Sequence, residues 1–105
     1  MSKRLLFLIL CGQLFGNEIS YGATYLVTTT DDAGPGSLRQ AIIDANSNTG
    51  ADVIEFNISP AGENTITPSD ASGALPAIID QVTIDATTQP GYAGTPLVEL
   101  SSVEP

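Results

Sequence analysis

The stretch that decides the fold is GPGSLRQAI, which occupies residues 34–42. Its two glycines and its proline form a turn. After this turn the hydroxyl of Ser37 can accept the backbone N–H of Gln40, and the Gln40 side chain can reach back to Ser37. This Ser-x-x-Gln capping box predicts a helix that begins directly after Ser37.

The predicted helix has one apolar face. Leu38, Ala41, Ile42 and Ala45 follow the i, i+3, i+4, i+7 spacing of such a face. The polar sequence NSNTG at residues 46–50 then ends the helix. A helix of about three turns is only marginally stable alone in water. We therefore expect its apolar face to dock on other elements.

The rest of the chain favours strands. Residues 25–30 are mainly β-branched or aromatic, which predicts a strand before the turn. From residue 52 onward the pattern is of short β-rich segments separated by glycine and proline turns. These segments are residues 53–58, 65–67, 77–79, 82–86 and 97–100. Such spacing suits either a sandwich or a β-solenoid.

The N-terminus has the three-part layout of a secretory signal peptide. Lys3 and Arg4 form a charged start, residues 5–15 are mainly apolar, and small residues follow at Ser20 and Gly22. We expect cleavage after Gly22, so that residues 1–22 are the signal peptide. The chain is then secreted or placed on a cell surface.

Two alternatives to cleavage are disfavoured. An uncleaved membrane anchor needs roughly 18 apolar residues, more than the run provides. A lipid anchor on Cys11 needs a small residue before the cysteine, where Leu10 stands.

Cleavage limits the chemistry of residues 23–105. It removes the only cysteine and two of the three cations, Lys3 and Arg4, which leaves Arg39 among many carboxylates. An acidic chain of this kind repels nucleic acid, because affinity for phosphates depends on cations. Without cysteine or histidine it also lacks the nitrogen and sulfur ligands of zinc. We expect Arg39 to form a structural ion pair with Asp31, Asp32 or Asp52.

Carboxylate pairs are the main candidates for catalysis. Asp31 with Asp32, or Asp80 with Asp85, could flank a sugar bond as glycoside hydrolysis requires. Aspartates beside glycine and proline more often organise turns, which we favour. Calcium would find oxygen ligands, but no calcium-loop motif is present. Tyr92 could stack on a sugar, although packing over its turn is the preferred interpretation.

We therefore predict no catalytic, cofactor-binding or metal-binding residues and no cofactor. The residues expected to matter are structural: Ser37, Leu38, Arg39, Gln40 and Ile42.

Two motifs carry a family resemblance. GPGSLRQAI at residues 34–42 and TTQPGY at residues 87–92, the latter followed by GTPLVEL at residues 94–100, resemble the N-terminal region of bacterial exported proteins with right-handed parallel β-helix, pectin-lyase-like, repeats. The resemblance implies a mainly β fold. Residues 23–105 would be the start of a right-handed parallel β-helix, with an N-terminal capping strand and one short α-helix.

The resemblance also implies a function. The chain would be the non-catalytic N-terminal capping segment of an exported or surface β-solenoid protein, adhesive or structural. The alternative is the N-terminal fragment of a carbohydrate-active β-helix enzyme, a polysaccharide lyase or glycoside hydrolase, whose catalytic coils are missing.

The chain departs from this family in two respects. Many relatives carry cysteine where Gly36 stands, and they continue long after the segment at residues 97–100, so that this chain looks truncated. A core of this size gives little stability by itself. The expected partners are further β-helix coils or another copy of the chain, and extracellular carbohydrate is a possible ligand. Nucleic acid is excluded, as is a membrane after cleavage.

Overall fold

The computed structural model describes residues 22–69 and 71–101. The predicted signal peptide, apart from Gly22, lies outside these ranges. The elements, in chain order, are β1 (Thr24–Val27), α1 (Leu38–Asn46), β2 (Asp52–Phe56), β3 (Asn64–Ile66), β4 (Val82–Asp85), a short 3-10 helix η1 (Ala86–Thr88) and β5 (Val98–Leu100).

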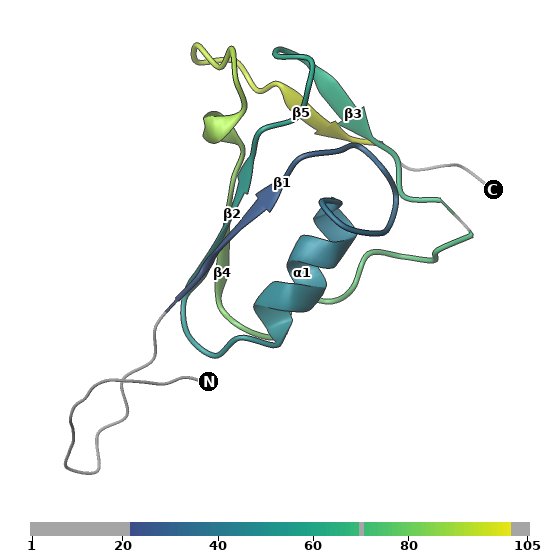
Figure 1. Cartoon of the computed structure of the whole chain (residues 1–105), viewed down its shortest axis with the longest axis vertical. Coiled ribbons are helices and arrows are strands. Elements are labelled where there is room, and N and C mark those ends of the chain that lie inside the picture. The colour runs from purple at the N-terminus through teal and green to yellow at the C-terminus, as the bar shows by residue number, and fades with distance from the viewer. Residues whose placement is uncertain (1–21, 70, 102–105) are drawn as a thin grey trace.

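The strands form two small parallel sheets (Figure 1). One sheet has the order β1-β2-β4, and the other pairs β3 with β5. The two successive segments at residues 52–66 and 82–100 therefore each supply one strand to each sheet. Ile54 lies beside Ile84 in the first sheet, and Ile66 lies beside Leu100 in the second.

The core lies between α1 and the inner face of the three-stranded sheet, with β3 at its far end (Figure 1). Residues of β2 alternate between buried and half-buried, as expected for a strand with one face against a core. The helix buries the apolar face expected from its sequence spacing. The buried apolar side chains are Val27, Leu38, Ala41, Ile42, Ala45, Ile54, Phe56, Ile58 and Ile66.

The start of α1 depends on a tight turn. Gly36 has a φ of 82°, a left-handed conformation that side chains rarely adopt. Its carbonyl oxygen accepts the backbone N–H groups of Thr28 and Thr29 at 2.9 and 3.3 Å. A Cβ at this position would lie 2.5 Å from the hydroxyl oxygen of Thr28. Any side chain at this position would therefore be strained.

The expected fold class, a mainly β chain that begins a right-handed parallel β-helix, is wrong for the described residues. They form a small structure of short parallel strands around one helix, without the repeated superhelical turns of a solenoid. The physical reason is the brevity of the strands, which are three to five residues long and are joined by long irregular segments. A solenoid core needs several stacked repeats.

One predicted strand is also wrong. Residues 77–79 are irregular, and Ile78 and Ile79 are exposed. The side chain of Asn46 at the end of α1 binds this segment: it donates to the carbonyl of Ala77 at 2.8 Å and accepts the N–H of Ile79 at 3.0 Å. A helix-end amide thus occupies backbone groups that a strand would need.

Candidate functional site

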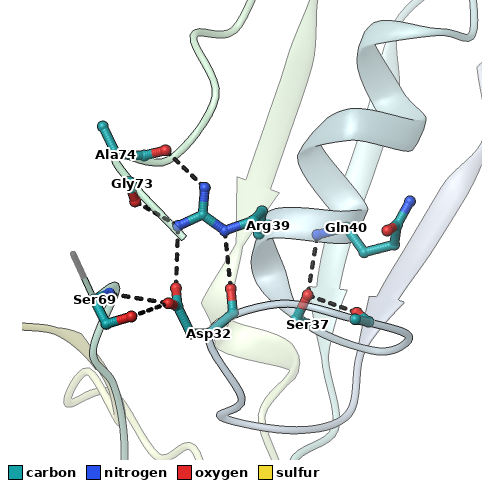
Figure 2. A network of polar contacts seen from close by, with 8 residues as sticks. Asp32, Ser37, Arg39, Gln40, Ser69, Gly73 and Ala74 are labelled. Carbon is teal, nitrogen blue, oxygen red and sulfur yellow. Dashed lines mark hydrogen bonds and ion pairs between the residues drawn. The ribbon is translucent and has the colours of Figure 1, made fainter. Parts of the chain in front are cut away.

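Arg39 is the centre of a polar network that joins residues far apart in the sequence (Figure 2). Its Nε donates to the carbonyl of Asp32 at 3.0 Å, Nη1 to the carbonyl of Ala74 at 2.7 Å, and Nη2 to the carbonyl of Gly73 at 2.6 Å. Nη2 also pairs with Oδ1 of Asp32 at 3.0 Å. One side chain thereby fastens two loops to the first turn of α1.

Asp32 is the partner of Arg39 among the three carboxylates considered. Its second oxygen, Oδ2, accepts the N–H of Ser69 at 3.1 Å and the Ser69 hydroxyl. The Ser69 hydroxyl, followed by the Arg39 guanidinium, holds the pKa of Asp32 well below its usual range. Asp32 is therefore ionised at neutral pH, which is the opposite of what a general acid requires.

The geometry of Arg39 fits a structural role. Its side chain is only 10% exposed, and four donor contacts join it to carbonyls and to one carboxylate. Arginine presents its donors in a planar fork, so several acceptors can be held at fixed angles. The arrangement binds the loop before α1 to the loop after β3.

Ser37 is the N-cap residue of α1. Its hydroxyl oxygen accepts the N–H of Gln40 at 3.1 Å, and the hydroxyl donates to the carbonyl of Gly34 at 2.7 Å (Figure 2). The reciprocal half of the capping box differs from expectation, because the Gln40 side chain donates to Asp44 at 2.9 Å. The cap is therefore one-sided.

Among the aspartates considered for catalysis, Asp32 pairs with Arg39 and Asp85 organises a turn, whereas Oδ2 of Asp80 is buried without a hydrogen-bond partner. Oδ1 of Asp85 accepts the N–H of Thr87 at 3.0 Å and its hydroxyl at 2.6 Å, which caps η1 and lowers the pKa of Asp85. Asp31 donates its N–H to the hydroxyl of Thr29 at 3.2 Å. Within residues 22–69 and 71–101, no group of three or more His, Cys, Asp or Glu side chains could hold a metal ion.

The TTQPGY motif has a structural role that its sequence does not reveal. The hydroxyl oxygen of Thr88 accepts the N–H of Phe56 at 2.7 Å. The buried Gln89 amide accepts the N–H of Ile58 at 2.9 Å and donates to the carbonyl of Ile58 at 2.8 Å. These side chains continue the pairing of β2 where β4 has ended. In the sequence, the one indication of this role is that the polar residue Gln89 stands directly before a proline-glycine turn.

Asp52 is a second residue of unrecognised importance. It is 1% exposed at the start of β2. Its Oδ1 accepts the N–H of Ala23 at 2.8 Å and the side-chain amide of Asn48 at 2.7 Å. It therefore joins the start of β1 to the end of α1, and it is not the partner of Arg39 in the described structure.

A shallow depression runs along β3 and β5 on the described surface. Its lining includes Glu63, Asn64 and Glu99, and no aromatic side chain. Tyr92 is 38% exposed and is not part of this lining. The aromatic stacking surface of a typical sugar site is thus missing from the depression.

No helix in the described ranges is long and apolar enough to cross a membrane.

The site geometry therefore consists of structural contacts: an arginine network, a helix cap, and side chains that substitute for a strand. Comparison of the chain with protein-family models, curated proteins and solved structures gives no match, so the family resemblance of its two motifs stays a prediction.

Proposed function

We propose that this chain is a non-catalytic, exported N-terminal segment that closes one end of a larger body of parallel β structure. In this role α1 and its preceding loop cover the end at β1. The outer edges of β4 and β5 receive the next parallel strands. The host is a secreted or cell-surface protein with an adhesive or structural role.

A difference between the two ends of the sheets carries the proposal. At one end, the core-facing Val27 of β1 is 0% exposed although β1 is an edge strand among the described residues. At the other end, Ile84 of β4 is 44% exposed, whereas its register neighbour Ile54 is 0% exposed. The β1 end is covered and the β4 end is open.

The second sheet repeats this difference. Leu100 of β5 is 56% exposed, whereas its register neighbour Ile66 of β3 is 1% exposed. In each sheet, a row of apolar side chains thus runs from the core to an outer strand, β4 or β5. The last side chain of each row is exposed. Such an edge is a template for a further strand.

The geometry specifies what the next strands would carry. They would run parallel to β4 and β5 and place apolar side chains beside Ile84 and Leu100. Covering the remaining exposed area of these two side chains would contribute about 1 kcal/mol each. Backbone hydrogen bonds along both edges would fix the register.

Export is supported by the sequence alone. The charged start, the apolar run and the small residues at Ser20 and Gly22 form the pattern of a cleavable leader. Arg39, the sole cation after Gly22, is taken up by Asp32 and three carbonyls, which supports a structural role over a catalytic one.

The proposal is tested by the association of the exported chain. An open edge without its next strands pairs with other copies, so sedimentation should show mass that rises with protein concentration. Ile84→Lys and Leu100→Lys place charges on the open edges and should return the chain to monomer. Leu26→Lys is the matched control, because Leu26 is 47% exposed on β1. A stable monomer that melts cooperatively, or equal effects of all three variants, would contradict the proposal.

A further inference from the structure

Asp52 is a buried carboxylate with one oxygen unaccounted for. Oδ1 accepts two hydrogen bonds, from the N–H of Ala23 and from the side chain of Asn48. Oδ2 is fully buried and has no hydrogen-bond partner in the described structure. An unpaired carboxylate oxygen in a protein interior is costly, because it has lost its water.

One of the two donors to this carboxylate belongs to the residue that follows the expected cleavage site. Ala23 N lies 2.8 Å from Oδ1 of Asp52. The carbonyl of Ala23 is held in turn by the N–H of Val53 at 2.8 Å. Ala23 is thus fixed to β2 on both sides of its Cα atom, with its nitrogen directed at the carboxylate.

We propose that Asp52 is the binding site for the N-terminal ammonium group that leader cleavage creates at Ala23. A signal peptidase adds one water across the Gly22–Ala23 peptide bond. The C–N bond breaks, the hydroxyl joins the Gly22 carbonyl carbon, and the Ala23 nitrogen leaves as an amine. At neutral pH this amine is protonated. The inference rests on the export and cleavage included in the proposed function.

Cleavage replaces one donor by three. As a peptide nitrogen, Ala23 has a single N–H, which Oδ1 occupies. As an ammonium group it has two more N–H bonds and a positive charge. A second N–H can then reach Oδ2, so that the buried carboxylate gains an ion pair and a partner for its second oxygen. Leader cleavage would therefore strengthen the attachment of the start of β1 to β2.

Gly22 fits both states of this junction. A Cβ built on Gly22 would overlap the carbonyl oxygen of Ala51, so that only glycine fits there before cleavage. A small residue is also what a signal peptidase requires immediately before the cut. Both the packing against Ala51 and the cleavage reaction therefore require a small residue at position 22.

Two further titratable groups belong to this corner. Burial, followed by the nearby charges of Asp52 and Asp44, raises the pKa of Tyr25. Tyr25 therefore stays neutral through the range in which an amine titrates. The carboxylate of Asp52, 2.8 Å from Ala23 N, favours a protonated amine there.

The sequence allows a selective test. Lys3 is the only lysine and lies in the leader, so the α-amine is the only primary amine after cleavage. The exported protein is collected, and its mass establishes whether it begins at Ala23. Its acylation rate is then measured against pH, with and without denaturant. Pairing should slow acylation of the folded chain at least about tenfold, since each unit of raised pKa lowers the free amine about tenfold.

Two variants separate pairing from simple burial. Asp52→Asn keeps the shape but removes the charge, and its folded rate should rise to that of the unfolded chain. Asp80→Asn is the matched control, because Oδ2 of Asp80 is also buried and unpartnered, and its rate should stay at the wild-type value. If Asp52→Asn does not fold, the wild-type pH profile decides: its midpoint should lie above about 8, the usual value.

The outcomes keep the two proposals apart. A midpoint at or below about 8, or equal protection in Asp52→Asn, overturns the pairing and leaves export standing. A product that keeps its leader or begins at another residue overturns the cleavage on which the inference rests. Neither result bears on the open edges of β4 and β5.

Discussion

At the scale of single residues, Arg39 joins three segments of the chain through one planar group. We predict that Arg39→Lys lowers the free energy of unfolding by about 1.5–3 kcal/mol, because an ammonium group cannot reach all of the acceptors that the guanidinium spans. Urea unfolding measures the loss. Arg39→Ala should cost at least as much, and full stability in Arg39→Lys would show that charge alone is sufficient.

The ion pair of Asp32 with Arg39 also predicts an acid limb of stability. The pKa of Asp32 is lowered in the folded chain, so its contribution is complete above the unfolded value of about 4 and is lost as the pH falls. Asp32→Asn removes this contribution. The stability difference between wild type and Asp32→Asn should shrink from pH 6 to pH 2, as followed by urea titrations at each pH.

The neighbouring residue provides the control for this acid limb. Asp31→Asn changes a carboxylate outside the ion pair and should leave the pH dependence largely intact. An equal change in both variants would show that net charge, rather than the Asp32 contacts, sets the acid limb.

Gln89 is the second decisive residue, since its amide serves both backbone groups of Ile58. We predict that Gln89→Leu lowers the free energy of unfolding by about 3 kcal/mol, because a buried N–H and a buried carbonyl lose their partners. Gln81→Leu, at an exposed position, should change stability little. Thermal melts of both variants give the comparison, and similar losses would contradict the assigned role.

At the scale of elements, α1 depends on its N-terminal cap. Ser37→Ala should cost about 1 kcal/mol, because the N–H of Gln40 loses its acceptor. Ser47→Ala at the other end removes only an exposed contact to the carbonyl of Ile43 and should cost less. Circular dichroism during urea unfolding measures both losses. A larger loss for Ser47→Ala than for Ser37→Ala would contradict the stabilising role of the N-terminal cap.

Local patterns explain which elements could be predicted. The start of α1 follows from Ser37 and the turn before it, all within a few residues, and the apolar spacing sets the buried face. The partner of Arg39 could be narrowed to three carboxylates, because a cation in the first turn of a helix opposes the helix dipole and needs a carboxylate nearby. The choice of Asp32 depends on how the loop folds back, which no local pattern contains.

Contacts between distant residues explain what could not be predicted. Gln89 meets Ile58, and Ala23 meets Asp52, across separations of 31 and 29 residues. The segment at residues 77–79 has the composition of a strand, but Asn46 occupies its backbone groups. The expected β-helix failed for a similar reason: the composition suits parallel strands, whereas the number of strands that stack is decided by the whole chain.

At the scale of the whole molecule, the covered β1 end and the open β4 and β5 end determine the proposed role. Val27 is buried at the first end, whereas Ile84 and Leu100 are exposed at the second. Amide hydrogen exchange of the exported chain, compared between dilute and associated samples, locates the edge that pairs. We expect slower exchange on association at residues 82–85 and 98–100, with β1 unchanged. Slower exchange confined to β1, or association that protects neither outer strand, would contradict it.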